Sequence, residues 1–177
     1  ELIPSTPEPL SELERNAEFF SGFIKKLYLP SYPELNISGD CNIRELNRKS
    51  FYVLSLGANK KYREWPYKYY AKIAQKIHKK TGWLGLICGA ENEFDLGEHI
   101  KKLCDAPLQN YSGQTTLPEL ACLLVKSQLL ISNETGTAHI AHAVGTPTVC
   151  ILGGGHFGRF APYPELSGKI NNLNVVY

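Results

Sequence analysis

Three residues in the last third of the chain have types and a spacing that could do chemistry. Glu134, Thr135 and His139 lie in a polar, glycine-containing turn and the short helical pattern that follows it. Thr135 and His139 are four residues apart, so on a helix they share one face. An imidazole on that face could meet a phosphate oxygen or a sugar hydroxyl.

The helix expected after Glu134 also has a start that suits an anion. Thr135, Gly136 and Thr137 would leave backbone N–H groups open at the positive end of the helix dipole. A threonine N-cap followed by glycine is equally an ordinary helix start. Glu134, His139 and His142 do not have the spacing of a standard metal site, so no metal is expected, and His142 is expected to be packed or at the surface.

A second group of candidates lies in the stretch GANKKYREW, residues 57–65. Lys60, Lys61 and Arg63 follow Gly57 within a few residues. Cationic side chains together with flexible backbone donors suit a diphosphate, whose oxygens accept both kinds of hydrogen bond. An ordinary solvated loop with surface lysines explains the same composition.

The elements that must position these residues alternate along the chain. Apolar runs of strand length occupy residues 51–56, 83–88, 129–132 and 148–152, and residues 108–111 form a weaker strand pattern. Helical patterns follow the first four of these five segments in chain order, at residues 66–82, 93–104, 116–125 and 135–144. Because the strands are apolar on both faces, the pattern predicts an α/β fold: a Rossmann-like parallel sheet flanked by helices.

In such a sheet, ligands bind beyond the carboxyl ends of the strands. The unusual loops all fall at that edge: GANKKYREW, GAENE, NETGTAH and GGGHFGRF follow the first, second, fourth and fifth strands. Neither a GxGxxG nor a GxxxxGK[ST] motif occurs, which argues against a nicotinamide-dependent dehydrogenase and a P-loop nucleotidase. No GxSxG motif indicates a hydrolase.

Composition limits the remaining classes of function. The 177 residues are 43% hydrophobic and 20% charged with a net charge of +2, as in an ordinary globular protein without a nucleic-acid partner. The five cysteines have no CxxC spacing, which predicts reduced thiols in a cytosolic protein. No apolar run approaches the length of a membrane span. The chain begins at Glu1 and contains no Met, which suggests a fragment or a processed product.

The first 49 residues differ from the rest. Ser11 and Glu14 have the spacing of a capping box, and an amphipathic helical pattern runs from there to Pro30. A segment rich in Asn, Gly and Pro follows as far as Ser50. We therefore expect residues 1–49 to form an amphipathic helix and an interdomain connector, and residues 50–177 to form the Rossmann-like domain.

Taken in order, the motifs SLGANKKYREWP, ICGAENE and YSGQTTLPELACLLVKSQLLISNETGTAHIAHAVGTPTVCILG closely resemble one family. They are similar to the C-terminal half of the ADP-heptose:lipopolysaccharide heptosyltransferases, glycosyltransferase family 9. The resemblance covers about residues 50–165. It implies a GT-B fold, in which two Rossmann-like domains face each other across a cleft, with this chain as the nucleotide-sugar-binding domain.

The resemblance also implies roles for individual residues. Arg63 stands where the family has a lysine that neutralises the donor phosphate, and Glu93 matches an acceptor of ribose or sugar hydroxyl groups. Glu134 stands where the family has an aspartate. The other positions that the resemblance and the loops assign to the donor are Gly57, Asn59, Lys60, Lys61, Thr135, Gly136 and His139.

The implied activity is inverting transfer of a sugar from a nucleotide-diphosphate donor, expected to be ADP-heptose, to a lipopolysaccharide core or another glycan. The family's general base is an aspartate of the N-terminal domain, so this chain is expected to bind nucleotide without transferring sugar by itself. No cofactor is required. The expected location is the cytoplasm, with peripheral contact at the inner membrane. A non-catalytic nucleotide-sugar-binding module and a GT-B-type sugar-nucleotide epimerase stay open as alternatives.

Overall fold

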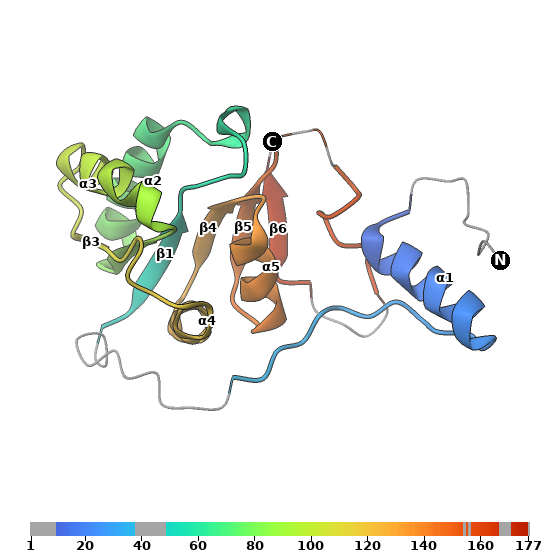
Figure 1. Ribbon diagram of the computed structural model, residues 1–177. Helices are drawn as coiled ribbons and strands as arrows, with labels where there is room; N and C mark the ends of the chain where they lie inside the picture. Colours follow the sequence, from blue (N-terminus) through green and yellow to red (C-terminus); the bar gives the residue numbers. More distant parts are fainter. Residues whose placement is uncertain (1–9, 38–48, 154, 156, 167–170, 177) are drawn as a thin grey trace.

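A parallel β-sheet forms the centre of the molecule (Figure 1). The computed structural model describes residues 10–37, 49–153, 155, 157–166 and 171–176. Within these residues the sheet has six strands in the order β3-β2-β1-β4-β5-β6. The strands are β1 (Phe51–Ser55), β2 (Leu84–Cys88), β3 (Leu108–Asn110), β4 (Leu130–Asn133), β5 (Thr148–Ile151) and β6 (Leu173–Val176).

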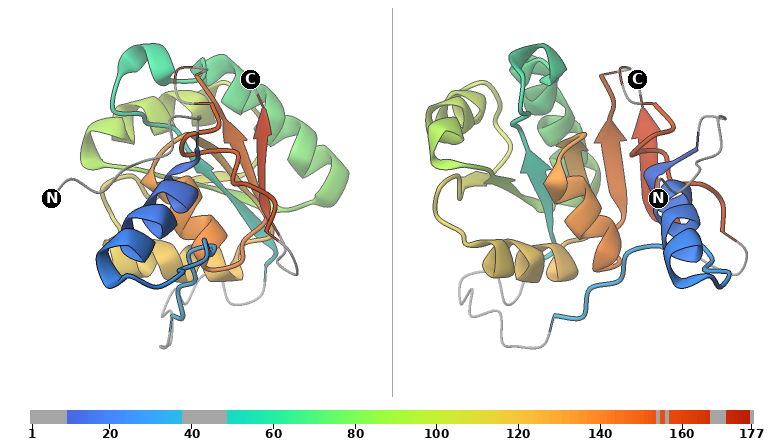
Figure 2. Two further views of the ribbon diagram at one scale, coloured as in Figure 1. Left: turned by 90° about the vertical axis from the view of Figure 1, so that its right-hand side faces the viewer. Right: turned by 45° about the vertical axis from the view of Figure 1, so that its right-hand side comes forward.

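Helices cover both faces of the sheet (Figure 2). Successive residues of β1 point to opposite faces, so Tyr52 belongs to one core cluster and Val53 to the other. The helices are α2 (Tyr67–Thr81) and α3 (Phe94–Lys102) on the Tyr52 side, and α4 (Leu117–Lys126) and α5 (Gly136–Ala143) on the Val53 side. Short 3₁₀ turns, η1 (Lys61–Arg63) and η2 (Glu91–Glu93), precede α2 and α3.

The helix boundaries follow the local signals in the sequence. α2 begins directly after Pro66 and ends at Gly82, whose φ of 72° is the left-handed conformation that glycine adopts without strain. α4 begins with a capping box, in which the Thr116 N–H donates to Glu119 Oε2 at 2.7 Å. The predicted strand and helix alternation is therefore confirmed from Phe51 to Ile151.

The amphipathic helix near the amino terminus is also present as α1 (Glu12–Ile24), with the capping box of Ser11 and Glu14. It lies beside the β6 edge of the sheet, and its Glu12 N–H donates to the carbonyl of Arg159 at 2.8 Å (Figures 1 and 2). The end of α1 does not pack against the rest of the described chain, as the 71% exposure of Phe23 shows.

The segment after α1 lies on the domain. Tyr32 is buried, and its hydroxyl donates to the carbonyl of Pro164 at 2.7 Å. The Leu35 N–H donates to the carbonyl of Ala143 at the end of α5 at 2.8 Å. These contacts hold residues 30–37 against α5, while residues 38–48 of the expected connector lie outside the described residues.

Two features differ from the sequence-based expectations. Strand β6 pairs in parallel with β5 and was not predicted. Cys122 takes part in a disulfide bond, so the prediction of reduced thiols was wrong at this residue, whereas Cys88, Cys104 and Cys150 are free thiols. Cysteine spacing alone does not reveal whether a given cysteine forms a disulfide bond. No helix in the described ranges has the length and apolar character needed to cross a membrane.

Candidate functional site

Asn133, the last residue of β4, organises the carboxyl edge at the middle of the sheet. Its buried side-chain amide donates to the carbonyls of Leu56 and Gly57, which follow β1. Its Oδ1 accepts a hydrogen bond from the Trp65 N–H at 2.9 Å. One side chain therefore fixes both ends of the basic loop, residues 57–65, against the end of β4.

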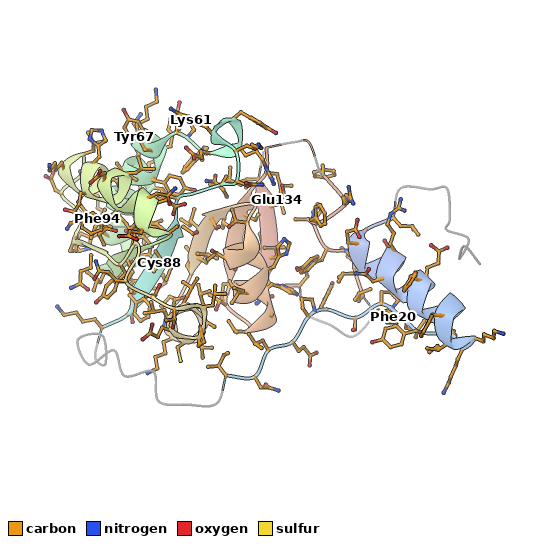
Figure 3. The ribbon with its side chains drawn as sticks, viewed as in Figure 1. Phe20, Lys61, Tyr67, Cys88, Phe94 and Glu134 are labelled. Atoms are coloured by element: carbon orange, nitrogen blue, oxygen red, sulfur yellow. The ribbon has the colours of Figure 1, made fainter. Side chains whose placement is uncertain are left out.

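Arg63 and Glu134 form an ion pair across this junction. Arg63 Nη2 lies 2.7 Å from Glu134 Oε2 and also donates to the Glu134 carbonyl at 3.3 Å. The two side chains are 21% and 6% exposed. Figure 3 shows Glu134 below the turn that carries Lys61, where β4 gives way to α5. Because both bonds use Nη2 and a guanidinium has five N–H donors, the pair leaves Arg63 with further donors.

The start of α5 lies directly after this ion pair. Thr135 is the N-cap, but its side chain does not cap the helix, and its hydroxyl lies 3.3 Å from Ser132 Oγ. Gly136 is exposed, and a Cβ built there would meet nothing within 4 Å. Backbone N–H groups at the positive end of α5 are thus open beside Arg63, an arrangement that suits an anion.

Glu93 lies at the same edge but has a different environment. Its carboxylate fits beside two glycines, since a Cβ built on Gly57 would lie 1.5 Å from Oε1 and one on Gly89 would lie 1.8 Å from Oε2. The Ala90 N–H donates to Oε2 at 3.2 Å. Burial is the main cause that raises the pKa of Glu93, and the nearby Glu64 adds to it, while hydrogen bonds from the Ala90 and Gly57 backbone act in the opposite direction.

A pocket of about 580 Å³ opens between η1 and η2. It joins the basic loop to the loop of Glu93, and its walls combine aromatic rings with charged groups. The ring of Trp65 stacks on Tyr69 at 5.4 Å and meets Tyr70 edge-on at 5.0 Å. The lining side chains that matter here are Lys61, Glu64, Trp65, Tyr67 and Glu93.

The two histidines of α5 have structural partners. His139 Nδ1 lies 2.7 Å from the Tyr163 hydroxyl, and burial lowers the pKa of His139 although the nearby Glu134 raises it. His142 is 5% exposed and packs edge-on against the rings of Tyr32 and Tyr163. Burial likewise lowers the pKa of His142. His142 is therefore packed, as expected.

The structure brings together some of the residues expected to bind a donor. Arg63 forms an ion pair with Glu134, and the Glu93 side chain packs beside Gly57. The start of α5, which has no side-chain cap, comes directly after Glu134 in the chain. Lys61 lines the pocket, whereas Asn59 and Lys60 are exposed on the loop. In the described part of the chain, no group of three or more His, Cys, Asp or Glu residues is placed to hold a metal ion.

Sequence reasoning missed two residues that shape this site. Asn133 directly precedes Glu134 at the end of an apolar run. A polar residue at the carboxyl end of a predicted strand could have indicated its role. Tyr163 follows His139 by 24 residues and had no comparable signal.

Curated relatives agree on one family. The family model described as glycosyltransferase family 9 (heptosyltransferase) matches residues 7–175. Lipopolysaccharide core heptosyltransferase OpsX of Haemophilus influenzae is 30% identical over 129 residues, which are 72% of this chain and 37% of that protein. Lipooligosaccharide heptosyltransferase 2 of the same organism is 28% identical over 120 residues, 64% of this chain and 33% of that protein. The chain thus spans about a third of the length of these relatives.

Solved structures share the fold. A family 9 glycosyltransferase from Veillonella parvula superposes with a TM-score of 0.73 at 15% identity, over 82% of this chain and 44% of that one. Heptosyltransferase WaaC of Escherichia coli, solved with ADP-2-deoxy-2-fluoro heptose, gives 0.61 at 16% identity, over 96% of this chain and 51% of that one. The predicted Rossmann-like sheet of the GT-B heptosyltransferases is confirmed, and the chain belongs to glycosyltransferase family 9.

Proposed function

We propose that this chain is the donor-binding half of a heptosyltransferase with a GT-B fold. The observation that carries the proposal is the position of Arg63, held by Glu134 at 2.7 Å directly before the uncapped start of α5. A guanidinium and open backbone N–H groups at one point provide the two kinds of donor that a diphosphate accepts. The diphosphate of the donor binds there.

The rest of a nucleotide sugar divides between the neighbouring features of the edge. Glu93 accepts hydrogen bonds from hydroxyl groups of the ribose or the sugar, because its carboxylate has several acceptor positions and forms no salt bridge with another described residue. The pocket next to it, with Trp65 and Tyr67, accommodates the remainder of the nucleoside. The names of the relatives, and ADP-2-deoxy-2-fluoro heptose in the E. coli enzyme, support ADP-heptose as the donor.

In the reaction, this chain stabilises the leaving group. As the bond to the anomeric carbon breaks, negative charge grows on the departing diphosphate, and Arg63 and the start of α5 offset it. The acceptor hydroxyl of a lipopolysaccharide core attacks from the opposite side and needs a general base. We assign that base to a second domain, to which residues 1–49 connect residues 50–177, in an enzyme that works in the cytoplasm.

Calorimetric titration with ADP, UDP, GDP and CMP tests the donor. We expect ADP to bind most tightly, and Arg63→Ala to weaken ADP binding about tenfold or more, because it removes a charged hydrogen-bond donor. Lys101→Ala removes a cation on α3 and should leave the affinity unchanged. Equal or absent binding of all four nucleotides would contradict the proposal.

Turnover tests the division of labour between the two halves. The isolated chain, supplied with ADP-heptose and a lipopolysaccharide core acceptor, should release no ADP above background. Release that depends on the acceptor would show that this chain holds a general base of its own.

A further inference from the structure

Basic and acidic side chains are unevenly distributed along the chain. Eight of the 19 Lys and Arg residues lie between Lys60 and Lys80, but only Glu64 of the 17 Asp and Glu residues does. The small net charge of +2 therefore hides a strongly basic segment within a chain that is otherwise acidic. The basic loop accounts for three of these cations, and α2 carries the other five.

The five lysines of α2 form one exposed stripe. At 3.6 residues per turn they fall within about a third of the helix circumference. The opposite side of the helix holds the buried residues Tyr70, Ala71 and Ala74, which pack on the sheet. The lysine face of α2 consists of Lys68, Lys72, Lys76, Lys79 and Lys80, all of which are exposed.

No salt bridge between described residues involves the lysine face. α2 contains no acidic residue, and the ion pairs among the described residues involve Arg63, Lys101 and Arg159 instead. The amines of Lys68 and Lys72 lie 5.4 and 5.5 Å from the centre of the Tyr69 ring, a cation–π arrangement that leaves their charge in place.

The lysine face does not stabilise α2. Lysines four residues apart repel each other on a helix surface. The helix dipole favours Lys79 and Lys80 in the last turn, but it disfavours Lys68 in the first. A face that weakens its own helix is better explained by an anionic partner.

Exposed tyrosines continue the surface at the start of α2. Tyr62 is 85% exposed and Tyr69 is 38% exposed. Figure 3 shows Lys61, the neighbour of Tyr62 in the chain, on the opposite side of the molecule from α1. Tyrosine rings with lysines beside them match the boundary between water and lipid, where aromatic rings enter the headgroup layer and amines meet phosphates.

We propose that the lysine face of α2 docks on a membrane surface through anionic phospholipid headgroups. The docking itself does not depend on the proposed transferase function. α2 begins directly after the basic loop. If the transferase function also holds, docking through α2 keeps the donor site close to a membrane that contains the lipid-linked acceptor.

Cosedimentation with vesicles tests the proposal. The chain should bind vesicles of phosphatidylcholine mixed with phosphatidylglycerol, should not bind phosphatidylcholine alone, and should dissociate as salt is raised. Replacing Lys68, Lys72 and Lys76 together by Gln should weaken binding to the anionic vesicles about a hundredfold. The matched control removes the same charge elsewhere, at the exposed residues Lys25, Lys26 and Lys49.

The outcomes separate the alternatives. Loss of binding in the control variant to the same degree would overturn the proposal, because net charge or α1 would then be responsible. Equal affinity for a double-stranded DNA oligonucleotide at the same salt would also overturn it in favour of a general polyanion surface. The α2 variant should keep the wild-type affinity for ADP, so failure of the donor proposal and failure of the membrane proposal are seen in different assays.

Discussion

Glu134 and Glu93 lie at the same edge of one sheet but differ in what surrounds them. Glu134 follows β4 and faces the guanidinium of Arg63 at 2.7 Å. Glu93 belongs to the loop after β2 and fits beside Gly57 and Gly89, where it accepts a hydrogen bond from the Ala90 N–H. The Glu134 carboxylate is paired with a cation. The Glu93 carboxylate fits in the space beside two glycines and accepts a backbone hydrogen bond.

We propose that this difference separates a structural role for Glu134 from a binding role for Glu93. The charge of Glu134 is used within the protein, where it orients Arg63 and joins the basic loop to the start of α5. Glu93 forms no salt bridge with another described residue, and burial raises its pKa. A carboxylate in that condition gains from hydroxyl donors that a ligand brings. Residue type and sheet edge alone therefore do not define the role of a carboxylate.

Removing Glu134 should have the largest effect on stability. Glu134→Ala leaves Arg63 without its partner, and we expect the free energy of unfolding to fall by about 2–3 kcal/mol, less than for a fully buried pair because solvent still reaches Arg63. Glu98→Ala is the matched control: it removes a pair with Lys101 in which each side chain is 34% exposed, together with a hydrogen bond from Asn110, and it should cost less than about 1 kcal/mol. Urea unfolding measures both, and equal losses would contradict a bracing role for Glu134.

Filling the space beside Glu93 should affect binding more than stability. A Cβ in Gly57→Ala would collide with the end of the Glu93 side chain, which can turn away. Turning Glu93 out of place should weaken ADP binding about tenfold, while the free energy of unfolding changes by less than about 1 kcal/mol. Gly155→Ala is the control, because a Cβ there meets nothing within 4 Å. An unchanged ADP affinity in Gly57→Ala would remove Glu93 from the donor site.

Periodicity predicted the central strands well and the last one not at all. β1 and β4 are buried on both faces, so their apolar residues are consecutive, Phe51–Leu54 in β1 and Leu130–Ile131 in β4. In β6 only Leu173 is buried, and its neighbours Asn174 and Val176 are exposed. An edge strand of four residues with one buried side chain gives no pattern that distinguishes it from a loop.

The sequence predicted candidate residues for the site but not how they pair. Arg63 and Glu134 were both predicted to face the donor, yet 71 residues separate them, and spacing reveals neighbours only within one element. The same limit applies to Glu93, whose fit beside Gly57 and Gly89 depends on how two loops approach each other. The resemblance to the family placed these residues at one edge, and the contacts among them required the structure.

Glu93→Gln should produce the smallest effect, and its sign is opposite to that of Glu134→Gln. Because the pKa of Glu93 is raised in the folded state, its protonated form is favoured by folding, and that contribution is lost as the pH rises through the folded-state pKa. At pH 7 the ionised group therefore costs stability. Glu93→Gln should raise the free energy of unfolding by less than about 1 kcal/mol, since the group is only half-buried.

The pH dependence distinguishes this cause from a general change in packing. The advantage of Glu93→Gln over the wild type should be present at pH 7 and should shrink toward zero in acid, where the wild-type carboxyl is protonated. Glu134→Gln should be less stable than the wild type at pH 7, because it uncouples Arg63 from a charge. Urea unfolding of both variants across this pH range measures the two curves. Two curves of the same sign at pH 7 would mean that the carboxylates have the same role, and the comparison between them would fail.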